Sequence, residues 1–408
     1  MTQMPAMLEG IRVLEVAEYG MVPAAASVLA EWGADVIKIE HSTRGDAIRG
    51  INAFGVPRGA GGFTYLWETF NRGKRSAGVD IASEAGRRIV HELAAGADVF
   101  LTNFLPEARR RLRIDADDIR AVKPDIVYGR GSAHGPRGLE AERGGFDGLT
   151  YWYRSGAASS AMPAGTDQLI PMPGPAFGDI QTGVALAGGV CAALVRRGRT
   201  GHGAVVDTSL LNSGMWAMQA TLVGSNLIGA DQLEPFDRTA ATNPLNNTYR
   251  TKDGRFLALA MLQADRYWAP LCEVIGHREL LDDTRFATID TRAEHHRPCI
   301  EALDGIFAER TLAEWEQILD AQEGQWCVVE KVGDLNRDEQ ARVNGYLQTV
   351  DYGDGRTIDL VPSPVQFDEC PATMRPAPAH AVHTDEVLTE LGYSWEQILE
   401  LKIDGAVT

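Results

Sequence analysis

The 408-residue sequence is short of positive charge, because 39 Lys and Arg stand against 56 Asp and Glu and the formal net charge is -17. Such a chain repels polyanions such as DNA and anionic lipid surfaces. It also has no apolar run approaching the ~20 residues that span a bilayer, and no basic-then-apolar leader at its N-terminus. We therefore expect a cytoplasmic protein with no nucleic-acid partner and no membrane association.

Cysteine is also scarce, with five residues that are odd in number and show no Cys-x-x-Cys spacing. They are Cys191, Cys272, Cys299, Cys327 and Cys370. This pattern predicts buried thiols, and neither disulfides nor a zinc site. Because 44% of the residues are hydrophobic, the chain can bury a sizeable core, and its length suggests two or three domains.

The first half of the chain alternates strand and helix patterns. Short apolar runs predict strands over residues 11–16, 35–40, 77–81, 99–101 and 126–128. Helical patterns occupy residues 84–94 and 116–122. Alternation of this kind predicts an α/β fold, with a mainly parallel sheet covered by helices in a Rossmann-like half. The first turn, Tyr19-Gly20-Met21-Val22-Pro23, has one glycine and lacks Gly-x-Gly-x-x-Gly, so a nicotinamide or flavin cofactor is not expected.

The second half changes in style. We expect a helix over 183–195, a turn over 197–201, a strand over 204–208 and a helix over 210–228. A hairpin around Lys252-Asp253-Gly254 precedes helical patterns over 268–275, 299–309 and 312–320. The predicted organisation is a large Rossmann-like domain over 1–228, a linker over 229–246, a small α+β domain over 247–330, a crossing linker over 331–378, and C-terminal helices over 379–408 that return to the large domain.

Asp179 is the candidate nucleophile. It follows a Pro/Gly loop and Gly178, and precedes an apolar helix that we expect to begin near Thr182. Gly178 lets a bulky electrophile approach the backbone, and free N–H groups at a helix start favour the ionised carboxylate. This combination suits covalent acyl chemistry. The alternative is that Asp179 only caps the helix.

Two basic clusters stand out in this acidic chain. Asn71-Arg72-Gly73-Lys74-Arg75-Ser76 precedes the third strand, and Asn103-Phe104 with Arg109-Arg110-Arg111 follows the fourth. Open sheets of this class bind ligands at the carboxyl ends of their strands, and grouped Arg and Lys suit a multiply phosphorylated ligand such as coenzyme A. The alternative is a solvated helix face paired with nearby acids.

In order and spacing, these motifs resemble the family III CoA-transferases, which include formyl-CoA and carnitine CoA-transferases and, as a divergent branch, 2-methylacyl-CoA racemases. The resemblance covers nearly the whole chain. It rests on residues 8–15, 33–40, 71–76, 103–104, 178–179, 200–203, 206–210 and 383–388.

The resemblance implies that CoA passes from an acyl-CoA thioester to a small carboxylic acid through covalent intermediates on Asp179. The CoA thioester is then a substrate, and neither a permanently bound cofactor nor a metal is expected. The implied CoA-binding positions are Lys74, Arg75, Asn103, Phe104, Arg111 and Gly20. The family fold further implies a homodimer of two chains threaded through one another as linked rings.

The sequence departs from the family pattern in three places. Gly20 replaces a Gln that contacts the acyl intermediate in formyl-CoA transferases, and Met261-Leu262-Gln263-Ala264 replaces a glycine-rich loop, so an oxalate-type substrate is not expected. Backbone there or Gln263 remains a candidate to cover the site. Gly145-Phe146-Asp147 lacks the racemase His, and Phe cannot move a proton.

Several alternatives stay open. His134 is either a loop histidine bonded to backbone or a residue with a catalytic role near the substrate. Tyr151-Trp152-Tyr153 forms either an acyl pocket or part of the core or dimer interface. Residues 41–62, with Arg44, Arg49, Phe54 and Arg58, are placed where substrate contacts would fall. The rival functions are an acyl-CoA racemase or epimerase, and a CoA-binding protein with a degenerate site.

Overall fold

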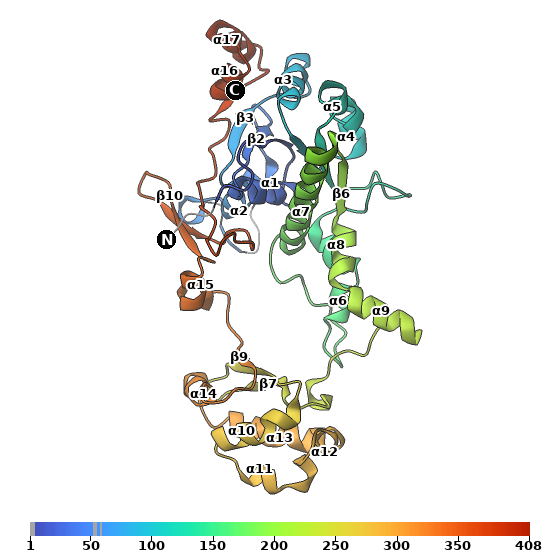
Figure 1. Cartoon of the computed structure of the whole chain (residues 1–408), viewed down its shortest axis with the longest axis vertical. Helices are drawn as coiled ribbons and strands as arrows, with labels where there is room; N and C mark the ends of the chain where they lie inside the picture. The colour runs from blue at the N-terminus through green and yellow to red at the C-terminus, as the bar shows by residue number, and fades with distance from the viewer. Residues whose placement is uncertain (1–4, 52–54, 58) are drawn as a thin grey trace. The chain divides into compact units, whose positions relative to one another are not determined.

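The computed structural model describes residues 5–51, 55–57 and 59–408 (Figure 1). The chain divides into two compact units. The first comprises the described residues of Met1–Ser160, Leu169–Leu233 and Glu339–Thr408, and the second comprises Ala161–Gln168 and Glu234–Asp338. Each unit has its own hydrophobic core.

A six-stranded parallel sheet forms the centre of the first unit. Its strands are β1 (Arg12–Val16), β2 (Asp35–Glu40), β3 (Arg75–Gly78), β4 (Val99–Thr102), β5 (Val127–Ser132) and β6 (Val205–Ser209). They follow the order β3-β2-β1-β4-β5-β6, and every neighbouring pair is parallel. The predicted α/β fold with a mainly parallel sheet is therefore confirmed. The order reverses at β1 and β4, where folds of this class place their ligands.

Helices cover both faces of this sheet. The helices of the first unit are α1 (Met21–Glu31), α2 (Tyr65–Asn71), α3 (Glu84–Ala95), α4 (Pro106–Leu112), α5 (Ala116–Val122), α6 (Ala157–Ser160), α7 (Phe177–Thr200), α8 (Leu210–Ala217), α9 (Gln219–Ile228), α15 (Glu339–Val343), α16 (Thr384–Glu390) and α17 (Trp395–Ile403). Because side chains alternate along a strand, Val13 faces α1 and α7 while Leu14 faces α3, α5, α16 and α17. The result is a three-layer unit (Figure 1).

Helix α7 differs from the prediction at both ends. It begins at Phe177, before Thr182, and continues to Thr200 without the turn predicted over 197–201. Gly201, with φ of 72°, ends it in the left-handed conformation. The 24-residue helix is long and apolar enough to cross a membrane by length and composition, contrary to our expectation. Its apolar residues Leu186, Ala187 and Val190 lie in the core beside α1.

The contact between α1 and α7 is close because both helices use small residues. A Cβ added at Gly183 would lie 2.7 Å from the Cβ of Ala24 and 2.8 Å from the Met21 carbonyl oxygen. Figure 1 shows the two helices side by side on one face of the sheet. One turn before Gly183, Asp179 is thereby held beside the start of α1.

The second unit is a smaller α+β structure. Strands β7 (Asn246–Arg250), β8 (Phe256–Ala260) and β9 (Trp326–Val328) form an antiparallel sheet, and the β7–β8 hairpin is the one predicted from sequence. Its helices are α10 (Ala264–Val274), α11 (Glu279–Asp282), α12 (Ile289–Glu294), α13 (His296–Phe307) and α14 (Leu312–Leu319). The short strand β9 has no periodicity that could have predicted it.

Residues 331–378, predicted as a linker, contain further regular structure. Strands β10 (Gln348–Asp351) and β11 (Thr357–Leu360) form an antiparallel hairpin in the first unit. The C-terminal helices α16 and α17 then pack Val387 and Ile398 against the sheet. The single helix predicted over 210–228 is likewise divided into α8 and α9 at Met218.

Candidate active site

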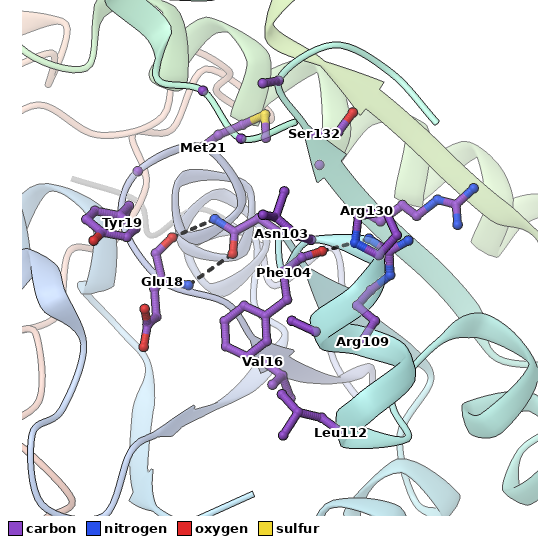
Figure 2. Close-up of a pocket in the computed structure, with 18 of the residues that line it drawn as sticks. Val16, Glu18, Tyr19, Met21, Asn103, Phe104, Arg109, Leu112, Arg130 and Ser132 are labelled. Atoms are coloured by element: carbon purple, nitrogen blue, oxygen red, sulfur yellow. Dashed lines mark hydrogen bonds between the residues drawn. The ribbon is translucent and has the colours of Figure 1, made fainter. Parts of the chain in front are cut away.

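A cavity of about 720 Å³ lies in the first unit where the parallel strands end (Figure 2). Its walls come from the segments that follow β1, β2, β3, β4 and β5, together with the start of α7. It therefore occupies the reversal in strand order between β1 and β4. The cavity therefore lies where folds with this strand order bind their ligands.

Asp179 lines this cavity as the third residue of α7. The residue before the helix is Ala176, in a left-handed conformation with φ of 60° and no side-chain cap. The alternative that Asp179 is a helix cap is therefore wrong. A Cβ added at Gly20 would overlap the Asp179 carboxylate, so a side chain at position 20 would displace the candidate nucleophile.

The environment of Asp179 disfavours its charged form. Burial raises the pKa of this half-buried side chain to about 7, and the neighbouring Asp147 carboxylate adds to the effect. Our expectation that the helix start keeps Asp179 ionised is wrong. One reason is visible in the hydrogen bonds, because Asp147 accepts the amide N–H of Gly178 at 3.1 Å and occupies a donor at the start of α7.

Gly178 has a packing role. It is buried against Tyr151, and a Cβ added there would lie 2.5 Å from the Tyr151 Cγ. Tyr151 and Trp152 belong to a π-helical turn, Gly148–Tyr153, and both are buried. Of the two open readings of this aromatic run, the structure favours core for these two residues.

The predicted residues after β4 do line the cavity. Asn103 accepts the Glu18 amide N–H at 3.1 Å and donates to the Glu18 carbonyl oxygen at 2.6 Å, which ties the ends of β1 and β4 together (Figure 2). Phe104 is half-buried, and its carbonyl oxygen accepts a bond of 2.7 Å from Arg109. Arg111 also lines the cavity and is exposed to solvent.

The cluster over residues 71–76 does not reach the cavity. The Lys74 side chain is fully enclosed, with its Nζ 2.6 Å from Glu15 Oε2, 2.9 Å from the Pro23 carbonyl oxygen and 3.0 Å from Asn71 Oδ1. Arg75 pairs with Asp35. Neither residue lines the cavity, so their assignment as CoA contacts stays a prediction that the cavity does not support. The cluster precedes β3 and therefore lies at the amino end of a parallel strand, whereas the cavity lies at the carboxyl ends of the strands.

Two other candidates stay predictions. His134 is half-buried beside the cavity wall formed by Ser132, Ala133 and Gly135, and its Nδ1 has no hydrogen-bond partner among the described residues. Gln263 belongs to the second unit, where it immediately precedes α10.

Sequence reasoning missed several residues of the cavity. Glu18 and Tyr19 follow β1, Arg130 and Asp207 pair across β5 and β6, and Phe146 stacks edge-on against Tyr19 with ring centroids 5.5 Å apart. Burial, with Asp46 as the next cause, raises the pKa of Glu18. The rule that ligands bind where parallel strands end would have identified Glu18 and Tyr19, which follow β1.

Of the segment over residues 41–62, His41 and Arg44 line the cavity. Arg49 instead forms an ion pair of 2.8 Å with Glu40. Phe54 and Arg58 lie outside the described residues.

The cysteines are all free thiols. Cys272, Cys299 and Cys370 are buried as predicted, whereas Cys327 on β9 is exposed, so the prediction of buried thiols fails there. Among the described residues, no group of three His, Cys, Asp or Glu side chains has the arrangement of a metal site.

A parallel sheet with a cavity at its carboxyl edge is the architecture of a ligand-binding α/β protein. A family model described as CoA-transferase family III matches residues 8–384, and the chain belongs to this family. The predicted family is confirmed, and the chain is a CoA-transferase by membership.

Individual proteins support the same conclusion over the full length. The (R)-2-hydroxy-4-methylpentanoate CoA-transferase of Clostridioides difficile is 33% identical over 97% of this chain and 98% of its own. The cinnamoyl-CoA:phenyllactate CoA-transferase of Clostridium sporogenes is 30% identical over 98% of this chain and 96% of its own. The crystal structure of a CAIB/BAIF family protein from Brucella suis matches with a TM-score of 0.81 and 25% identity, over 96% of this chain and all of that one.

Proposed function

We propose that this enzyme transfers coenzyme A from an acyl-CoA thioester to a small carboxylic acid through covalent intermediates on Asp179. The observation that carries the proposal is the position of Asp179 in the cavity wall, with Gly20 leaving room for its carboxylate. Two relatives are named for transfer involving 2-hydroxy-4-methylpentanoate and phenyllactate, which supports carboxylic acids as acceptors.

In the first step, the Asp179 carboxylate attacks the thioester carbonyl. A C–O bond forms, the C–S bond breaks, and the electron pair leaves with CoA as a thiolate, so the enzyme carries a mixed anhydride. The thiolate then attacks the Asp179 carbonyl and expels the acyl group as its free carboxylate, which leaves an aspartyl-CoA thioester. An incoming acid takes the CoA by the reverse steps, and each step exchanges one anion for another.

The surroundings of Asp179 suit this chemistry. The free carboxylate is charged, whereas the anhydride and the thioester are neutral at the same side chain. Burial and the charge of Asp147 destabilise the carboxylate and raise the pKa of Asp179 to about 7. The same surroundings therefore favour the covalent intermediates relative to the free enzyme.

The tetrahedral oxyanions need hydrogen-bond donors. Helix α1 begins at Met21, directly after Gly20. The first N–H groups of a helix have no acceptor within the helix, because no helical turn precedes them. We place the donors among these amides, where the positive end of the helix dipole also favours negative charge.

CoA itself would lie along Asn103, Phe104 and Arg111. Asn103 holds the ends of β1 and β4 in place, and Phe104 offers a half-buried ring to the cavity. Arg111 is exposed in the cavity wall, and no carboxylate pairs with it among the described residues. A guanidinium without a partner suits a CoA phosphate.

We also propose the interlocked homodimer that the family resemblance implies. In the first unit, Trp216 on α8 and Leu227 and Ile228 on α9 are 71%, 81% and 70% exposed. Large apolar side chains gathered in this way are typical of a surface that a partner covers. The free cysteines fit the reducing cytoplasm, which is the location that we propose.

Leu227→Lys tests the dimer, because a charge there would oppose burial of α9. Size-exclusion chromatography with light scattering should find about twice the 44.3 kDa chain mass for the wild type and a lower mass for the variant. A monomeric wild-type enzyme would contradict the proposal.

The function is tested by incubating the enzyme with a panel of acyl-CoA donors and carboxylic acids and detecting new thioesters by mass. We expect transfer for the wild type and a loss of at least about 1,000-fold in Asp179→Ala and Asp179→Asn, since neither side chain is a carboxylate nucleophile. Full turnover in either variant, or no transfer to any acid, would overturn the proposal. Exchange at C2 of the acyl group without an acceptor acid would indicate a racemase instead.

A further inference from the structure

The acyl group attached to Asp179 must lie beside two segments of the cavity wall. One is the turn Tyr19-Gly20, whose Gly20 touches the Asp179 carboxylate. The other contains Phe146 and Leu149, which line the cavity and are 58% and 62% exposed. The Phe146 ring meets the Tyr19 ring edge-on at 5.5 Å. The wall next to the reacting atoms is thus aromatic and aliphatic.

The charge at this end of the cavity is negative. Asp147 is 7% exposed and is held by the Gly148 amide at 2.8 Å and the Gly178 amide at 3.1 Å. Its charge acts on Asp179, and among the described residues no cation offsets it there. A second carboxylate on a substrate would therefore enter a region that already holds the charge of Asp147.

The cations of the cavity are directed elsewhere. Arg130 forms an ion pair with Asp207, and Arg109 bonds to Asp115 at 3.0 Å and to the Phe104 carbonyl oxygen. Burial and Asp46 raise the pKa of Glu18, and Arg44 offsets part of that rise. Among the described residues no arginine acts on Asp179. Within the part of the chain that the structure describes, Arg111 has no carboxylate partner and suits a phosphate of CoA, while the end of the cavity at Asp179 has no counter-ion for an acidic acyl tail.

We infer, on the basis of the proposed function, that this site selects monocarboxylic acids with apolar tails and rejects dicarboxylic acids, with Phe146 and Asp147 as the specificity-determining residues. The attractive part is burial of the tail against the Tyr19 and Phe146 rings. The repulsive part is the unpaired carboxylate that a dicarboxylic acid would place near Asp147, which keeps its charge while Asp179 is held as a neutral thioester. Discrimination of this kind arises from both parts together.

Hexanoate and hexanedioate test the inference, because they have the same carbon chain and differ by one terminal carboxylate. At pH 8, where both acids are ionised, the wild type should use hexanoate with a kcat/KM at least about 10-fold higher. Phe146→Arg supplies the missing cation and should narrow or reverse this ratio. Leu139→Arg adds the same charge at a residue that is 106% exposed and does not line the cavity, so it should leave the ratio unchanged.

The outcomes separate this inference from the proposed function. Equal or better use of hexanedioate by the wild type would overturn the inference while leaving CoA transfer intact. If Phe146→Arg leaves the ratio of kcat/KM for hexanoate over hexanedioate unchanged, the inference is also overturned. The substitution is compatible with folding because Phe146 is 58% exposed. If neither acid nor any other acid in the panel accepts CoA, the proposed function itself fails and the inference fails with it.

Discussion

Asp147→Asn should move the pH dependence of CoA transfer toward lower pH. Asp179 must be ionised to attack, so activity should rise with pH through the pKa of Asp179, which lies near 7. The substitution removes the negative charge of Asp147 but keeps an oxygen that can accept the Gly178 amide N–H. In the wild type this N–H is 3.1 Å from Asp147 Oδ2. The ionised form of Asp179 then becomes easier to reach.

The size of the change follows from the causes of the raised pKa. The value of about 7 is about 3 above the usual 3.8, and burial is the larger cause, with Asp147 second. Asp147 therefore accounts for less than half, which sets an upper limit of about 1.5 pKa units, or about 2 kcal/mol. We expect the midpoint of the acidic limb to fall by between about 0.5 and 1.5.

The assay is kcat/KM for CoA transfer measured from pH 5 to pH 9, with thermal unfolding followed in the same buffers. Asp231→Asn is the matched control, because Asp231 is exposed and does not line the cavity, yet its substitution removes the same charge. A purely structural role for Asp147 would lower stability without moving the midpoint. An unchanged or higher midpoint in Asp147→Asn would refute the reasoning.

Gly20→Ala should reduce transfer by at least about 100-fold, because its Cβ would overlap the Asp179 carboxylate. Asp179→Asn should raise stability at pH 8 by up to about 4 kcal/mol, since burial raises the Asp179 pKa to about 7 and the ionised side chain then opposes folding. The gain should vanish below pH 4, where Asp179 is protonated in both the folded and the unfolded chain. Lys74→Met should cost about 3 kcal/mol of stability by removing one of the two ammonium groups that pair with the buried Glu15 carboxylate, whereas Arg111→Ala should raise the KM for acyl-CoA about 10-fold at unchanged stability.

Matched measurements control these predictions. Gly144→Ala adds a methyl group elsewhere in the cavity wall, 3.9 Å from its nearest neighbour, and should retain most of the activity. Denaturant unfolding at pH 4 and pH 8 measures the change in the free energy of unfolding caused by Asp179→Asn. A variant less stable than the wild type at pH 8 would contradict the prediction. Steady-state kinetics and denaturant unfolding together distinguish a loss of stability, expected for Lys74→Met, from a loss of acyl-CoA binding, expected for Arg111→Ala. A raised KM for acyl-CoA in a Lys74→Met enzyme of normal stability would indicate that Lys74 contacts CoA.

The sheet and the family could be predicted because they depend on local patterns. Apolar runs separated by helical stretches predicted the strands, and the order of short motifs around Asp179 indicated the family. Residues after β4, such as Asn103 and Phe104, were placed correctly because they follow a parallel strand. Local sequence is enough where position along a strand decides which edge of the sheet a residue reaches.

The remainder depends on contacts between distant segments. Lys74 and Arg75 are as basic in sequence as Arg111, and only the fold shows Lys74 enclosed by Glu15 and the Pro23 carbonyl oxygen. The raised pKa of Asp179 requires Asp147, which is 32 positions away in sequence.

Contact between distant segments also explains why Gly20 is a glycine. Sequence alone showed Gly20 only as a missing Gln, whereas the structure shows it as space for the Asp179 carboxylate. Helix α7 continues through Thr200, into the turn predicted over 197–201, and the Gly201 N–H still bonds to the Arg197 carbonyl oxygen at 2.8 Å.

The central claim is that Asp179 becomes covalently bonded during turnover, and rapid quenching tests it most directly. The wild type is mixed with an acyl-CoA, quenched in acid, digested, and the peptide that contains Asp179 is weighed. The account predicts added mass of an acyl group or of CoA on that peptide in the wild type, and none in Asp179→Asn. Turnover by the wild type with no added mass on that peptide at any quench time, or with the mass on another residue, would contradict it.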